Sequence, residues 1–197
     1  MDGASVPTSA QTRLSVAALS RVAELGEAAL ALARPDVHPL EYVGLLMGKA
    51  LYPDAVRFLA HALPKREAVW WAWVSARRAA GENPPAKIQA ALDATEKWIA
   101  QPNEENRRSA MAAAQKAELG TAAGCAGLAA FFSGGSLAPP EAPVVPPGEF
   151  LAAKAVSGAV IFAAVAQEPE RAPERFRSFV AQGVEVTNRV KLWEPRS

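Results

Sequence analysis

Prolines divide this chain into segments, and the segments between them show the apolar spacing of amphipathic helices. Proline fits the first turn of an α-helix, but in a helix interior it removes a hydrogen bond and clashes with the preceding turn. No segment shows the strict alternation of apolar and polar residues that a half-buried strand requires. The pattern therefore predicts helices over residues 39–53, 54–63, 64–81 and 84–102.

The remaining segments also favour helices. Residues 8–34 are rich in alanine and leucine and begin with a capping-box pair, Thr8 and Gln11, so we expect one helix that ends before Pro35. Further helices are expected over residues 103–119, 121–132, 151–166 and 173–189. Helical repeats of about 30 to 40 residues would also fit, but no tetratricopeptide pattern recurs in register. The sequence thus predicts an all-α fold, an irregular bundle of about eight or nine helices.

The helix expected over residues 103–119 has two different faces. Asn103 is a favourable N-cap, and Glu104 precedes Arg107 and Arg108 by three and four residues. Ion pairs at this spacing on a helix surface contribute only roughly 0.2–0.5 kcal/mol each. The opposite face is almost entirely alanine, which favours the close approach of another helix.

Residues 133–148 interrupt the helical pattern with five prolines and three glycines. Gly134 and Gly135 are expected to end the preceding helix and form a turn. They do not form a phosphate-binding loop, which needs a lysine and a preceding strand. We expect three parts: a main helical domain (residues 1–136), an extended Pro-rich connector (137–148), and a C-terminal helical hairpin (149–197) packed on the main domain.

Three of the five tryptophans lie within four residues, in the sequence LPKREAVWWAW at residues 63–73. On a helix these indoles cover an arc of about 160°, which is wider than one narrow apolar stripe. One interpretation is that all three fill the core between several helices. In the other, at least one ring is exposed beside an arginine and anchors a protein partner. In that case the partner-binding residues are Arg66, Trp70, Trp71, Trp73 and Arg77. The connector is a second candidate for binding, because partners readily recognise solvated polyproline segments.

Composition excludes several classes of protein. Lys and Arg number 21 against 20 for Asp and Glu, without the basic stripe of a nucleic-acid-binding protein. Residues 150–166 are apolar but short, and Lys154 lies among them, so a buried core helix is favoured over a membrane span. Residues 1–10 do not resemble a secretory signal, and Cys125 is the one cysteine, so we expect a cytoplasmic protein with no membrane insertion.

Residues suited to catalysis are scarce. The chain has two histidines, His38 and His61, which with Cys125 do not form a metal-binding pattern. His38 suits a helix N-cap or loop, and His61 a helix surface. The small neighbours of Cys125 indicate a buried residue at a tight helix contact rather than a nucleophile. We therefore expect no enzyme activity, no metal and no cofactor. The alternative is a site of carboxylates that meet only in the folded chain.

Two strings, LPKREAVWWA (residues 63–72) and FFSGGSLAPP (131–140), carry a family resemblance. Over residues 51–190 the chain resembles an uncharacterised bacterial all-helical family associated with type VI secretion gene clusters. The resemblance implies an accessory, adaptor or chaperone-like protein whose partner is a secretion spike or effector protein. It supplies no catalytic residues. The alternatives are a structural module that forms homo-oligomers through an Ala-rich or Trp-rich face, and an enzyme whose site is not visible in the sequence.

Overall fold

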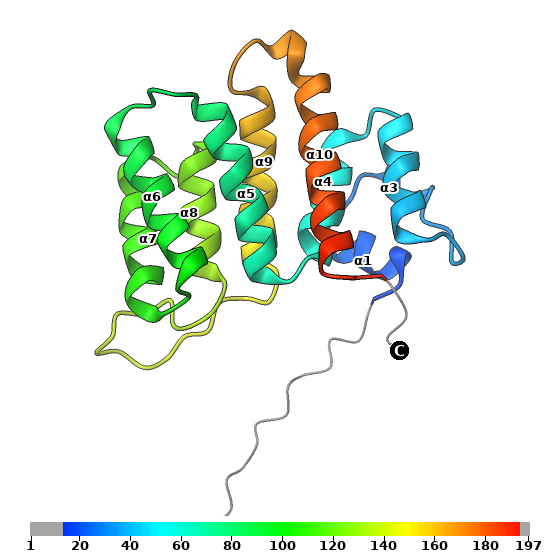
Figure 1. Cartoon of the computed structure of the whole chain (residues 1–197). Helices are drawn as coiled ribbons and strands as arrows, with labels where there is room; N and C mark the ends of the chain where they lie inside the picture. The colour runs from blue at the N-terminus through cyan, green and yellow to red at the C-terminus, as the bar shows by residue number, and fades with distance from the viewer. Residues whose placement is uncertain (1–13, 194–197) are drawn as a thin grey trace, which may run out of the picture.

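The computed structural model describes residues 14–193, which form ten α-helices, one 3₁₀ segment and no strand (Figure 1). The predicted all-α bundle is confirmed, with ten helices where about eight or nine were expected. In chain order they are α1 (Val16–Val22), α2 (Glu27–Leu30), α3 (Pro39–Gly48), α4 (Tyr52–Ala62), α5 (Lys65–Ala80), α6 (Ala86–Ala100), α7 (Glu104–Lys116), α8 (Ala122–Phe132), α9 (Leu151–Val165) and α10 (Ala172–Arg189), with the 3₁₀ segment (Pro169–Arg171) before α10.

The additional helix arises in the segment that was expected to form one helix over residues 8–34. The chain turns between α1 and α2, where Glu24 has a φ of 53°. Gly26 then becomes the N-cap of α2, and its N–H donates to Asp54 Oδ1 at 3.0 Å. The expected capping box of Thr8 and Gln11 lies outside the described residues. Within them Ser15 caps α1, accepting the N–H of Ala18 at 3.2 Å.

Side-chain caps at other helix starts agree with the sequence. His38 Nδ1 accepts the N–H of Leu40 at 3.3 Å at the start of α3. Asn103 Oδ1 accepts the N–H of Asn106 at 2.9 Å at the start of α7. Each cap satisfies a backbone donor that the first helical turn leaves without a partner. The N-cap predicted for Asn103, and the N-cap that was one of two roles considered for His38, are therefore confirmed.

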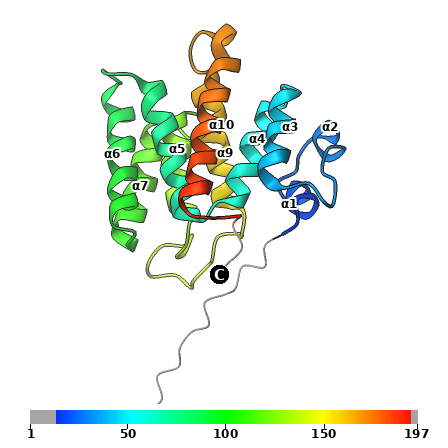
Figure 2. The same cartoon turned by 45° about the vertical axis from the view of Figure 1, so that its right-hand side comes forward.

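Helices α5, α8 and α9 form the centre of the bundle. Helix α5 packs against α6, α8 and α9, and α9 packs against α4, α5 and α8. Helices α6 and α7 lie at one end of the bundle and α1–α4 at the other (Figure 1 and Figure 2). Helix α10 lies against α4, α5 and α9. The two C-terminal helices thus share one apolar core with the rest of the described chain.

Small residues allow the central helices to approach closely. A β-carbon at Gly127 of α8 would lie 2.9 Å from both the Ala110 carbonyl oxygen and the Ala114 β-carbon of α7, so a larger residue would force the helices apart. A β-carbon at Gly158 of α9 would lie 3.2 Å from Cys125 Sγ. Cys125 is buried, its thiol donates to the Leu119 carbonyl at 3.1 Å, and burial raises its pKa. The alanine face of α7 and the buried position of Cys125 are both as predicted.

The apolar segment that includes α9 is a core helix, and its Val156 and Val160 side chains are fully buried. Among residues 14–193, no single helix is both long and apolar enough to cross a membrane. Helix α9 reaches that length only together with Pro169–Arg189, and the two parts are bent by 118°.

Candidate functional site

The three tryptophans of α5 occupy three different environments. Trp71 is fully buried, and its indole N–H donates to the Phe179 carbonyl of α10 at 2.9 Å. Trp73 is half-buried, and its N–H donates to the Leu92 carbonyl of α6 at 3.0 Å. Trp70 is also half-buried but lies beside the end of α10. Trp71 has no exposed surface to offer a partner of the folded protein, whereas part of Trp70 is accessible.

Trp70 lines a surface groove, which we call the Trp70 groove. It lies between α5, α6 and the end of α10 and has a volume of about 220 Å³. Trp70 and the apolar side chains give it a hydrophobic surface, and two arginines and one glutamate add charge. The lining residues are Arg66, Glu67, Trp70, Ile99, Val186, Arg189 and Val190.

The interpretation with an exposed indole included Arg66 and Arg77, and of these two arginines only Arg66 lines the groove. Arg66 Nε donates to the Ile99 carbonyl at 2.8 Å, so this guanidinium caps the C-terminal end of α6. Arg77 donates to Gln89 Oε1 at 3.0 Å and does not line the groove. The guanidinium over the indole belongs to Arg189, whose Cζ lies 5.7 Å from the centroid of the Trp70 ring. The arginine that lies over Trp70 therefore comes from α10 and not from α5.

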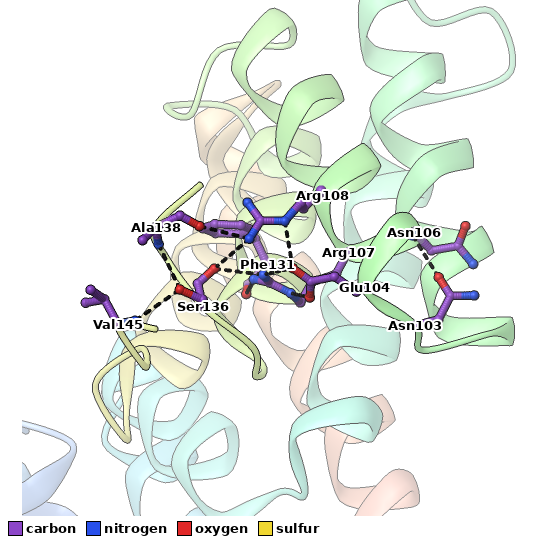
Figure 3. A network of polar contacts seen from close by, with 9 residues as sticks. All are labelled: Asn103, Glu104, Asn106, Arg107, Arg108, Phe131, Ser136, Ala138 and Val145. Carbon is purple, nitrogen blue, oxygen red and sulfur yellow. Dashed lines mark hydrogen bonds and ion pairs between the residues drawn. The ribbon is translucent and has the colours of Figure 1, made fainter. Parts of the chain in front are cut away.

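The second feature is a network of polar contacts centred on Arg107, whose side chain is only 4% exposed (Figure 3). Nε and Nη2 donate to the two carboxylate oxygens of Glu104 at 2.7 and 2.8 Å. Nη1 donates to the Phe131 carbonyl at 2.7 Å, and Nη2 also donates to the Ser136 carbonyl at 2.8 Å. The guanidinium carbon lies 4.4 Å from the centroid of the Phe131 ring. In the predicted surface pair, Glu104 is 53% exposed, but Arg107 is buried and joins α7 to the end of α8 and to the chain that follows it.

The same junction holds both ends of a loop in the connector. Ser136 Oγ accepts the N–H groups of Ala138 at 3.1 Å and Val145 at 3.0 Å, and the Leu137 N–H donates to the Val145 carbonyl at 2.8 Å. Arg108 Nη2 donates to the Ala138 carbonyl at 2.9 Å (Figure 3). Residues 137–148 form no helix or strand, as predicted, and Val144 is 76% exposed. The connector is therefore fastened at its neck, and the exposed Val144 side chain lies next to that neck.

Acid titration tests this network. Hydrogen bonds from Arg107 and Arg108 lower the pKa of Glu104 to about 2, although burial opposes the shift. An unfolded glutamate has a pKa of about 4.3, so the unfolded chain takes up this proton first. The stabilising contribution of Glu104 is therefore complete above about pH 4.3 and is lost as the pH falls toward about 2. We expect the free energy of unfolding, measured by urea denaturation, to fall more steeply over this window in the wild type than in Glu104→Gln.

The matched control for this titration is Glu105→Gln, which alters an exposed carboxylate outside the network. Parallel curves for the wild type and Glu104→Gln would contradict the assigned role of Glu104.

The histidines lie apart from both features. His38 caps α3, and His61 on α4 is half-buried, with its Nδ1 donating to the Arg57 carbonyl at 2.8 Å. Burial lowers the pKa of His61 and so favours the neutral ring. His61 was expected on a helix surface, and its partial burial beside the Phe150 ring differs from that expectation. Among residues 14–193, no three His, Cys, Asp or Glu side chains lie together as a metal site.

Comparison with known proteins gives one match. A family of unknown function, DUF6931, matches residues 42–187, which is most of the chain. The chain belongs to this family. The DUF6931 match includes Trp70, the Arg107 junction and the connector, and it ends two residues before Arg189. No curated protein and no solved structure matches the chain.

Proposed function

We propose that this DUF6931 protein is a non-catalytic adaptor that binds another protein through the Trp70 groove. The observation that carries the proposal is the half-buried indole of Trp70, with the Arg189 guanidinium carbon 5.7 Å from its ring centroid and Val186 and Ile99 lining the same groove. Tryptophan and arginine are the residue types that most often dominate the binding free energy of protein interfaces. An adaptor needs such an anchor and needs no reaction centre.

The resemblance to a helical family from type VI secretion gene clusters indicates where to seek the partner. On this basis the partner is a secretion spike or effector protein, and the adaptor binds it in the cytoplasm in a chaperone-like role before secretion. Trp70 lies on α5, which packs against both α6 and α10, and this placement supports the role because an anchor held by packed helices loses little conformational entropy on binding.

Substitution of Trp70 tests the proposal. Tagged full-length protein is purified from its native host, and associated proteins are identified by mass spectrometry. We expect Trp70→Ala to weaken the complex with a spike or effector protein at least about tenfold, since hot-spot truncations cost about 2 kcal/mol or more. Binding of the purified partner is measured by calorimetry.

Arg77→Ala is the matched control, because Arg77 is exposed on the same helix but lies outside the groove. It is expected to leave the affinity unchanged. Recovery of free protein only would contradict the adaptor proposal, and a complex that survives Trp70→Ala would contradict the choice of groove. Recovery of an assembly that contains only this chain would favour the homo-oligomer alternative.

A further inference from the structure

The charges of the Trp70 groove are not balanced. Arg66 and Arg189 line it together with a single carboxylate, that of Glu67. The Arg66 guanidinium already donates to backbone carbonyls at the end of α6. Within residues 14–193, the Arg189 guanidinium has no hydrogen bond or ion pair, and its contact is the Trp70 ring. The groove therefore has an excess positive charge, and Arg189 retains its donors.

The position of Arg189 makes those donors available to a ligand. A cation in the last turn of α10 is favoured by the helix dipole, but the dipole does not account for its place over an indole. A cation–π contact at this distance occupies none of the hydrogen-bond donors in the guanidinium plane. Two parallel N–H donors in that plane match the two oxygens of a carboxylate.

The rest of the groove suits one apolar side chain. Ile99, Val186 and Val190 line the groove together with the Trp70 indole. The volume of about 220 Å³ is below the roughly 300–1,000 Å³ of pockets that hold small-molecule ligands or cofactors. A single large side chain of a protein partner is therefore a better match than a small molecule.

We infer that the Trp70 groove binds an acidic segment of a partner protein, in which a carboxylate lies next to a large apolar side chain. The inference rests on the proposed function, since it specifies the ligand of the same groove. The apolar side chain packs on Trp70 between Ile99 and Val190, and the carboxylate accepts hydrogen bonds from the edge of Arg189.

Selection from a random 12-residue peptide library displayed on phage tests this inference. The library is panned on the folded full-length protein and, in parallel, on Arg189→Glu. We expect the wild type to enrich peptides with Asp or Glu within two residues of Leu, Phe or Trp. We expect Arg189→Glu to bind these peptides at least tenfold more weakly and to enrich peptides with Lys or Arg at the same position. Arg77→Glu makes the same charge change outside the groove and is expected to select the wild-type peptides.

The outcomes distinguish this inference from the proposed function. Enrichment of neutral or basic peptides by the wild type, no enrichment, or equal binding by Arg189→Glu would overturn the acidic ligand. If the binding of the selected peptides or of the native partner still depends on Trp70, the proposed function stands without the acidic ligand. If Trp70→Ala changes no binding at all, the proposed function itself fails.

Discussion

Replacing Trp71 with alanine is expected to lower the free energy of unfolding by about 3–5 kcal/mol. The indole is fully buried, so its removal leaves a cavity that the surrounding helices cannot close without moving. The substitution also removes the hydrogen bond of 2.9 Å to the Phe179 carbonyl. Urea denaturation followed by far-ultraviolet circular dichroism measures the effect without relying on tryptophan fluorescence.

Gly183 of α10 provides a control that reports on the position of the ring. A β-carbon at Gly183 would lie 2.9 Å from both Cε2 and Cζ2 of Trp71. Gly183→Ala is therefore expected to destabilise the wild type by about 1–3 kcal/mol through overpacking. In the Trp71→Ala background the added methyl group enters the vacated space, so the cost should fall to the part that comes from Leu59, whose Cδ1 would lie 3.2 Å from the same β-carbon. An equal cost of Gly183→Ala in both backgrounds would contradict this packing.

Trp71 also shows how far the sequence can predict the core. Helical spacing shows that the three indoles point in different directions, and the arc of about 160° implies more than one environment. It does not reveal which indole is buried, because α10 decides this from a distant part of the chain. The sequence signal for the contact is weak: Gly183 is a glycine inside a helix, and its function is evident only once the indole is seen against it.

The helix boundaries were predictable where a proline or a capping side chain marks them, as at Pro39 and Asn103. The turn between α1 and α2 was missed because it places a glutamate, Glu24, at positive φ, where glycine would have been the usual signal. Only some residues of the candidate site were predictable from the sequence. Trp70 was identified on α5, but Arg189 was not, because no local spacing connects two residues that meet only in the folded chain.

The sequence also predicted too small a contribution of the Glu104–Arg107 pair to stability, because the other partners of Arg107 come from distant parts of the chain. A spacing of three residues predicts a solvated pair on one helix. The structure adds the Phe131 ring, the Phe131 carbonyl and the Ser136 carbonyl, all from parts of the chain outside α7. Gly135 permits this contact, since a β-carbon there would lie 2.7 Å from Arg107 Nε. Because it is buried and has these additional acceptors, Arg107 joins three parts of the chain and does not act as a solvated surface charge.

Replacing Arg107 with methionine is accordingly expected to lower the free energy of unfolding by about 2–4 kcal/mol. Methionine retains much of the apolar contact with Phe131 but leaves the Phe131 carbonyl without its charged donor and the Ser136 carbonyl with only the 3.5 Å contact from Arg108 Nη2. Because Ser136 holds the neck of the connector loop, the substitution should also loosen the hydrogen bonds of that neck. We expect faster amide hydrogen exchange at Val145 and Leu137 than in the wild type, measured by NMR or mass spectrometry.

Arg108→Met separates burial from charge as the cause of this effect. Arg108 is adjacent on α7 and contacts the same Glu104 and the same stretch of connector, but its side chain is 28% exposed. Its loss is expected to cost at most about 1 kcal/mol, as for other solvated pairs. Equal costs for the two substitutions would mean that charge on α7, and not the buried fork of Arg107, holds the connector. A large difference, with exchange accelerated only in Arg107→Met, would mean that one buried guanidinium joins the end of α8 to the loop that follows it.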